Sequence, residues 1–251
     1  MVTGASRGVG RGVAIALAEA GFRVFATGRS ISSADLPPSI HRIPCDHLDD
    51  EQTKAAFAQL AANAGGVDVL VNNAWGGYQH MVEEGQFTWA LPFWEQPMHR
   101  RRSMLDAGVR AAFVASSLAA KMMVPRRQGF IVNISYWAAR KHMGNAIYGI
   151  SKAATDKMAS DMAEELRPHG IAAISLYPGL VRTEAVVGSG WFDLSNSESP
   201  EFIGRVIAAL WRDPNLLHRS GQVLVAAAVA SELGVQDVDG KQPVPLTVET
   251  A

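Results

Sequence analysis

The sequence predicts an α/β fold in which helices cover both faces of a doubly wound parallel sheet. Short apolar runs alternate with helix-like segments along the chain, as expected when helices connect parallel strands. A glycine-rich turn at residues 3–10 opens the first of these helices, where a phosphate group can bind. At 251 residues the chain is long enough for one large core, so we expect a single domain over residues 1–251.

The expected strands are short runs rich in apolar and β-branched residues. The first is reduced to Met1 and Val2, and the others are residues 23–27, 41–45, 67–71, 130–135, 171–177 and 222–227. A strand averages about five or six residues, and a central parallel strand is apolar on both faces. We therefore expect a truncated first strand, with either a natural start upstream of Met1 or a chain less stable than its relatives.

The expected helices are residues 9–20, 50–62, about 103–123, 146–167 and 200–211. In the first, apolar side chains such as Val9, Val13 and Leu17 recur at helical spacing and form one stripe that faces the core. The thirteen residues between strands 23–27 and 41–45 include Pro37-Pro38, which predicts a loop or single turn. The long aromatic segment from Trp75 to about Arg102 predicts a lid or binding loop.

The composition narrows the class of protein. An apolar content of 48% and a formal charge of −1 give no reason to expect a nucleic acid or an acidic membrane surface as partner. Cys45 is the single cysteine, which fits a reducing compartment. The sequence has neither a signal-peptide pattern nor an apolar run long enough to span a membrane. We expect a cytoplasmic protein without a membrane span.

The glycine-rich turn from Thr3 to Gly10 reads T-G-x-x-x-G-x-G and predicts a pyrophosphate site at a helix N-terminus, although ordinary glycine turns share this pattern. A carboxylate that binds the ribose 2′-hydroxyl of NAD is expected about 20 residues further on. Gly28 stands there instead. Arg7 and Arg29 are placed to pair with a 2′-phosphate and Ser6 to hydrogen-bond it, which favours NADP(H); solvated surface arginines are the alternative.

Five motifs in this order resemble the short-chain dehydrogenase/reductase family. They are the turn at 3–10, Asn72-Asn73-Ala74, Ser135, Tyr148-x-x-x-Lys152 and Pro178-Gly179-x-Val181-x-Thr183. The stretches RAAF, MMVP, SESPE, DPN and DVDG further resemble the dehydrogenase/reductase member 1 branch of that family. The resemblance implies a Rossmann-type sheet of about seven strands in the order 3-2-1-4-5-6-7. It also implies hydride transfer between a nicotinamide and a carbonyl or secondary alcohol, no metal, and a homodimer or homotetramer formed through the fifth and sixth helices.

The same resemblance implies a set of cofactor-binding residues. They are Gly4, Ser6, Arg7, Gly8, Val9, Gly10, Arg29, Asp46, Asn73, Ala74, Tyr148, Lys152, Pro178, Gly179, Val181 and Thr183. Asp46 would contact the adenine amino group, with a helix-capping loop aspartate as the alternative. The segment from Pro178 to Thr183 would brace the nicotinamide carboxamide, with a plain turn as the alternative.

Tyr148 and Lys152 are the expected catalytic pair. Their spacing places both side chains on one face of a helix. An ammonium close to a phenol lowers the phenol pKa from about 10 towards neutrality, as a general acid/base at about pH 7 requires. The resemblance implies that Lys152 also holds the nicotinamide ribose and that Ser135 hydrogen-bonds the substrate oxygen. Many members use the next residue, which is Tyr136 here; the spacing to Tyr148 favours Ser135.

Two departures from the family pattern stand out. Asp106-Ala107-Gly108 replaces the usual Asp-x-Asn, which removes an asparagine that anchors a proton-relaying water. We hypothesise that a helix loosened by Gly108 binds such a water through backbone carbonyls. In addition, Trp75 replaces the glycine of the usual Asn-Asn-Ala-Gly and places a bulky ring near the cofactor pocket.

The aromatic residues of the long segment leave two interpretations open. Phe87, Trp89, Phe93 and Trp94 either wall an apolar substrate pocket or fix the loop to the core. Residues 99–102, His-Arg-Arg-Arg, are expected to begin a helix in solvent. The sequence thus predicts an NADP(H)-dependent oxidoreductase for a largish apolar ketone or aldehyde. The alternative is a catalytically weak NADP-binding scaffold or regulatory protein of the same fold.

Overall fold

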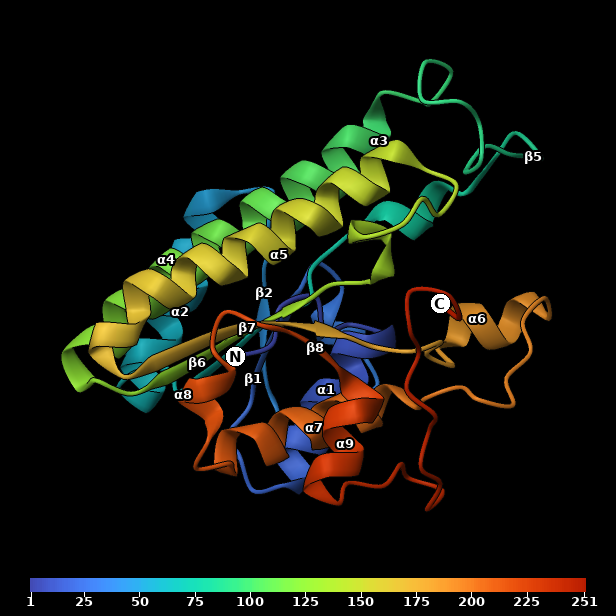
Figure 1. Cartoon of the computed structure of the whole chain (residues 1–251). Helices are drawn as coiled ribbons and strands as arrows, with labels where there is room; N and C mark the ends of the chain where they lie inside the picture. Colours follow the sequence, from blue (N-terminus) through green and yellow to red (C-terminus); the bar gives the residue numbers. More distant parts are fainter.

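The structure is a computed structural model that describes residues 1–251, apart from the side chains of Gln79 and His80. Parallel strands lie at its centre, with α2, α4 and α5 on one face and α1, α7 and α9 on the other (Figure 1). The predicted α/β fold with helices on both faces of a parallel sheet is confirmed.

The strands form two parallel ladders. In one, β1 (Phe25–Gly28) pairs with β2 (His41–Pro44). The other has the order β3 (Val69–Asn72), β6 (Gly129–Ile134), β7 (Ile171–Tyr177) and β8 (Val223–Val225). All seven residues of β7 are buried, which explains why the strands read as continuous apolar runs.

Val2 joins the two ladders, since it bridges in parallel to Ala26 on one side and to Val71 on the other. Its N–H donates to the Phe25 carbonyl at 2.9 Å, and its own carbonyl accepts from Thr27 at 3.0 Å. The predicted first strand is therefore a single bridging residue between β1 and β3. The buried Met1 ammonium donates to the Val69 carbonyl at 2.7 Å, and burial lowers its pKa to about 5.

The helices occur close to their predicted positions and pack in two layers. On one face, α1 (Gly8–Glu19) packs against α7 (Pro200–Arg212), with α8 (Leu216–Arg219) and α9 (Ala226–Leu233) nearby. On the other face lie α2 (Asp50–Ala64), α4 (Ala111–Met123) and α5 (Ala146–Leu166). The close contact of α1 with α7 requires Gly12, because a Cβ there would lie 2.3 Å from Pro200.

The helix predicted at about 103–123 begins earlier and is not uniformly α-helical. It runs from α3 (His99–Arg101) through a π-helical segment, η3 (Arg102–Arg110), into α4 and the 3₁₀ turn η4 (Val124–Arg126). The expectation that this start is solvated is wrong for Arg100, which is buried because Thr88 and Trp89 of the preceding loop cover it.

Among the described residues one helix, 99–126, is long and apolar enough to cross a membrane by length and composition. Core helices of soluble proteins pass the same test, and here the α4 part of this helix packs on α2, β3 and β6. The lack of a membrane span therefore stays a prediction.

The irregular connections carry short elements. Only the 3₁₀ turn η1 (Ile31–Ser33) lies between β1 and β2, as the prediction of a loop or single turn requires. The long loop after β3 contains η2 (Gly77–His80) and an unpredicted antiparallel hairpin of β4 (Val82–Glu83) and β5 (Gln86–Phe87), which projects away from the sheet (Figure 1). The remaining short helices are η5 (Trp137–Ala139), η6 (Arg167–His169) and α6 (Glu184–Ser189).

Candidate active site

The glycine-rich turn connects Val2 to α1 and is hydrogen-bonded to Asn73, which follows β3. Gly4 and Gly8 have φ of 67° and 56°, a conformation that favours glycine. A Cβ at Gly10 would lie 2.3 Å from the Asn73 amide nitrogen. That amide donates to the carbonyls of Thr3 and Gly4 at 3.1 and 3.0 Å. Asn73, predicted to bind cofactor, thus supports the turn.

The N-terminus of α1 already holds an anionic group. The Gly8 N–H donates to a carboxylate oxygen of Glu184 at 3.1 Å, and Arg11 pairs with the same carboxylate at 2.9 Å. A helix N-terminus attracts anions through its free N–H groups and its dipole. Glu184 therefore marks a position where the pyrophosphate of a dinucleotide fits.

The end of β1 lies beside the glycine-rich turn, since the Ala5 N–H donates to the Thr27 carbonyl at 2.9 Å. Gly28 leaves space for the Ser6 hydroxyl, since a Cβ there would lie 2.4 Å from Ser6 Oγ. This oxygen is buried and has no hydrogen-bond partner among the described residues. Arg7 follows Ser6 in the chain and Arg29 follows Gly28, and both arginines are exposed. The Asp46 carboxylate accepts from the Leu48 N–H at 3.0 Å within its loop, but Asp49 caps α2, so the helix-capping alternative is wrong for Asp46. An adenine contact stays a prediction.

Tyr148 and Lys152 lie in the first turns of α5, which begins where the Asn145 side chain accepts from the Tyr148 N–H at 3.1 Å. Both side chains are buried, and Lys152 Nζ donates to the Ile134 carbonyl at 3.2 Å. Burial lowers the pKa of Lys152 to about 8. Burial, with the neighbouring Tyr78, raises the pKa of Tyr148 well above 10.

The expectation that Lys152 lowers the pKa of Tyr148 is thus wrong for this structure. Lys152 Nζ lies 6.0 Å from the centre of the Tyr148 ring, and the loss of solvent around the phenolate dominates. Tyr148 is therefore a protonated hydrogen-bond donor at neutral pH.

Ser135 follows β6 and lies in the wall of the site, but its hydroxyl donates to the backbone carbonyl of Lys152 at 3.3 Å. Only 2% of Ser135 is exposed. Its neighbour Tyr136 stacks on Tyr148 with ring centres 6.5 Å apart. The predicted hydrogen bond from Ser135 to a substrate oxygen stays a prediction.

The two departures from the family pattern meet in space. A Cβ at Gly108 would lie 2.6 Å from Trp75 Cδ1, so the indole ring fills the side-chain space beside Gly108. Lys152 Nζ lies 4.9 Å from the centre of the Trp75 ring, within cation–π distance. The helix is indeed loosened at Gly108, since η3 is π-helical there. The role of a water in that position stays a hypothesis.

The aromatic loop contributes Trp89, which the sequence singled out, and Tyr78, which it did not. The Tyr78 hydroxyl lies 2.9 Å from the Tyr148 hydroxyl. Trp89 packs 5.2 Å from the Tyr148 ring and is fixed by a hydrogen bond from its indole N–H to the Met143 carbonyl at 3.2 Å. The other three candidate pocket aromatics, Phe87, Phe93 and Trp94, are 48%, 69% and 71% exposed, and the rings of Phe93 and Trp94 pack against each other with centres 5.1 Å apart.

The segment after β7 reaches back to the glycine-rich turn. Thr183 caps α6 by accepting from the Val186 N–H. Its side chain also lies beside Gly8, since a Cβ added at Gly8 would be 3.5 Å from the Thr183 methyl group. The Gly179 N–H donates to the carboxylate of Glu198 at 2.8 Å, and Val181 bridges to the Glu198 backbone. Sequence analysis missed Glu198, which is buried and whose pKa burial raises to about 7.

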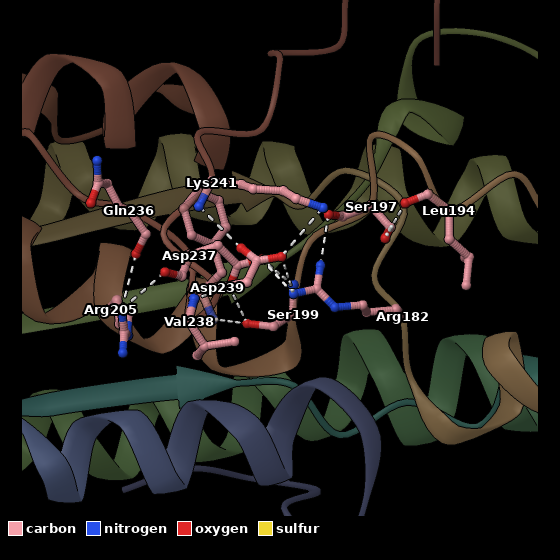
Figure 2. Close-up of polar contacts among 11 residues, drawn as sticks. Arg182, Leu194, Ser197, Ser199, Arg205, Gln236, Asp237, Val238, Asp239 and Lys241 are labelled. Atoms are coloured by element: carbon pink, nitrogen blue, oxygen red, sulfur yellow. Dashed lines mark hydrogen bonds and ion pairs between the residues drawn. The ribbon is translucent and has the colours of Figure 1, made fainter.

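A second polar network, also missed, fixes this segment from the C-terminal side (Figure 2). Arg182 donates to the Ser197 carbonyl at 2.8 Å and pairs with buried Asp237 at 3.0 Å. The Asp237 carboxylate accepts from the Ser199 N–H at 2.8 Å, at the start of α7. The stretches SESPE and DVDG thus meet around Arg182, although about 40 residues of chain separate them.

The site combines a helix N-terminus that contacts a carboxylate, a buried tyrosine–lysine pair and a segment after β7 held by Glu198. The family model described as short chain dehydrogenase matches residues 1–190, about three quarters of the chain. The chain belongs to the short-chain dehydrogenase family. This family membership agrees with the resemblance inferred from the five motifs.

Several proteins are similar in sequence to this short-chain dehydrogenase over most of its length. Dehydrogenase/reductase SDR family member 1 of Mus musculus is 38% identical, over 96% of this chain and 83% of that protein. The human protein of the same name is 36% identical over the same shares. L-xylulose reductase of Mus musculus is 32% identical over 73% of this chain and 71% of its own.

Solved structures of the family have the same fold. A 7α-hydroxysteroid dehydrogenase in complex with NADH and 7-oxo glycochenodeoxycholic acid superposes with a TM-score of 0.76. The two share 25% sequence identity, and the match covers 89% of this chain and 90% of that one. The family uses a nicotinamide cofactor, and the residues described above fit one.

Proposed function

We propose that this short-chain dehydrogenase is an NADP(H)-dependent oxidoreductase that transfers hydride between the nicotinamide and a carbonyl or secondary alcohol. The observation that carries the proposal is the buried Tyr148–Lys152 pair on one face of α5, beside the glycine-rich turn. The bound cofactor supplies or accepts the hydride. The residues of the chain hold the reactants and move the proton.

In the reducing direction, Tyr148 donates a hydrogen bond to the carbonyl oxygen and transfers its proton as that oxygen gains negative charge. Lys152 keeps a positive charge near the tyrosinate and is itself positioned by the Ile134 carbonyl. The surrounding rings of Trp75, Trp89 and Tyr136 exclude water, which strengthens these electrostatic interactions.

The choice of NADP over NAD is supported by charge. Arg7 follows Ser6 in the chain and Arg29 follows Gly28, and Ser6 and Gly28 lie side by side. Position 28 carries no carboxylate, which would repel a 2′-phosphate. The similar 7α-hydroxysteroid dehydrogenase binds NADH, so cofactor choice varies within this fold and needs a direct measurement.

The proposed substrate is a largish apolar ketone or aldehyde. The rings of Trp75, Trp89 and Tyr136 around Tyr148 favour an apolar substituent on the carbonyl. The relatives named for their substrates act on a sugar and on a steroid, which marks the range to be screened.

A panel of carbonyl compounds, supplied with NADPH and NADH in parallel, tests the proposal. We expect loss of reduced-nicotinamide absorbance with apolar ketones or aldehydes, a higher kcat/KM with NADPH, and no turnover by Tyr148→Phe. Tight NADPH binding without turnover of any compound would instead favour a catalytically weak scaffold or regulatory protein. Turnover by Tyr148→Phe at the unsubstituted rate would contradict the mechanism.

We also propose a cytoplasmic homodimer or homotetramer. The exposed apolar side chains of Phe113 on α4 and Ile150 on α5, 58% and 53% exposed, support association through these helices. The buried free thiol of Cys45 is compatible with a reducing compartment. Light scattering and fractionation of cells test the two statements separately.

A further inference from the structure

The site has one hydroxyl more than the catalytic pair requires, and it comes from the aromatic loop. Tyr78 belongs to η2, and its hydroxyl lies 2.9 Å from that of Tyr148, with either oxygen able to donate. This distance is normal for a hydrogen bond between two hydroxyl groups. Two side-chain O–H groups therefore face the same point of the site.

The position of Tyr78 is fixed by ring contacts on two sides. Its ring meets Trp75 edge-on with centres 4.7 Å apart, and it lies 5.5 Å from Trp89. Trp89 is itself anchored by its hydrogen bond to the Met143 carbonyl. The Tyr78 hydroxyl is thus held beside Tyr148 by residues of its own loop and by the segment before α5.

The side chain expected to supply a second donor is occupied elsewhere. The single proton of the Ser135 hydroxyl is donated to the Lys152 carbonyl, and the residue is 2% exposed. A carbonyl oxygen that accepts a proton from Tyr148 gains charge, and a second donor stabilises that charge in the transition state. The Tyr78 hydroxyl already lies beside that of Tyr148, whereas the Ser135 hydroxyl would have to leave the Lys152 carbonyl and rotate to reach the same oxygen.

We propose that Tyr78 is a catalytic residue that donates the second hydrogen bond to the substrate oxygen, alongside Tyr148. This inference rests on the proposed carbonyl reduction. An oxygen about 2.8 Å from both hydroxyls forms a near-equilateral triangle with them, so both O–H groups can point at it. The substrate oxygen then replaces the hydrogen bond between the two tyrosines.

The proton balance assigns different tasks to the two hydroxyls. As the carbonyl carbon accepts the hydride, the π electrons of the C=O bond move to the oxygen, which takes the proton of Tyr148. Tyr78 keeps its proton throughout, and Tyr148 is reprotonated from solvent. Loss of solvent around the Tyr78 hydroxyl raises its pKa to about 12, so Tyr78 stays protonated at neutral pH.

The test is Tyr78→Phe, which removes the hydroxyl and keeps the ring contacts with Trp75 and Trp89. We expect kcat to fall about 100-fold, as for loss of one donor to a developing oxyanion. KM and the Kd for NADPH should change little, because the hydrogen bond strengthens only in the transition state. A merely structural role of Tyr78 would change KM and the melting temperature instead.

Two further variants make the outcome decisive. Phe93→Leu, on the same loop and 69% exposed, is the matched control and should retain full activity. Ser135→Ala should lose less kcat than Tyr78→Phe. Wild-type turnover by Tyr78→Phe, with an inactive Tyr148→Phe, would overturn the role of Tyr78 and leave the proposed function standing. Activity in Tyr148→Phe would instead overturn the proposed function.

Discussion

Gly108 and Trp75 should depend on each other energetically, because the ring of one occupies the side-chain space of the other. In Gly108→Ala, the new Cβ would lie 2.6 Å from Trp75 Cδ1, whereas ordinary contacts of this kind are 3.4–4 Å. Overpacking of this kind costs about 1–3 kcal/mol, and replacing a helical glycine returns up to about 1 kcal/mol. We expect a net loss of about 1–2 kcal/mol and a melting temperature lower by about 2–8 °C.

The assay is a double-mutant cycle measured by urea unfolding. In a Trp75→Ala background the space beside residue 108 is open, so Gly108→Ala should be neutral or stabilise by about 0.5–1 kcal/mol. The coupling free energy between the two positions should then be about 1–3 kcal/mol. Gly188→Ala is the matched control, because a Cβ at that helical glycine of α6 meets nothing within 4 Å.

The same substitution should be visible in the chemistry of Lys152. The Trp75 ring lies 4.9 Å from Lys152 Nζ and contributes to the burial that lowers its pKa to about 8. Displacing the ring admits water and should raise that pKa. Equal effects of Gly108→Ala in both backgrounds, or no effect in the unsubstituted protein, would refute the steric reasoning.

Three further predictions concern charged groups around the site. Glu184→Gln removes the carboxylate from the Gly8 N–H and should lower the Kd for NADPH about two- to fivefold in a fluorescence titration; an unchanged or higher Kd would contradict competition for that position. Burial raises the pKa of Glu198 from 4.5 to about 7, so its contribution to stability is full below pH 4.5 and is lost as the pH rises through 7. Glu198→Gln should therefore have the same stability as the unsubstituted protein at about pH 4 and be more stable by about 3 kcal/mol at about pH 8. An equal stability difference at both pH values would contradict this. Asp237→Ala should lower the free energy of unfolding by urea by about 3 kcal/mol, which is the low end for a broken buried ion pair because Arg182 is partly exposed to solvent. Asp239→Ala is the control, because its carboxylate lies 3.6 Å from Arg182 and is 37% exposed, and it should cost less than about 1 kcal/mol.

Features that depend on neighbours in sequence were predictable. The apolar runs and helical stripes indicated the strands and helices, since each pattern follows from the local backbone geometry. The spacing of Tyr148 and Lys152 placed both on one face of α5, and the glycines of residues 3–10 indicated the turn before α1. The π-helical segment η3 and the hairpin of β4 and β5 have no comparable local signal.

The pKa of Tyr148 shows where sequence reasoning fails. Spacing alone suggested that Lys152 would lower it, whereas burial under rings from the loop at 75–98 and from Tyr136 after β6 raises it. The length and aromatic content of the loop at 75–98 signalled a functional segment, but nothing in it distinguished Tyr78 from Phe93. Both are more than half exposed, but the Tyr78 hydroxyl lies 2.9 Å from that of Tyr148, whereas the Phe93 ring packs on Trp94.

The sequence by itself determined the fold class, the family motifs and the positions of the catalytic candidates, because these follow from local periodicity and spacing. The tertiary structure decided that Trp75 fills the space beside Gly108, that Glu198 and Asp237 brace the segment after β7, and that Tyr78 reaches Tyr148. These are contacts between segments far apart in the chain. Desolvation and steric exclusion depend on such contacts, so they exist only once the sheet and its two helical layers have packed together.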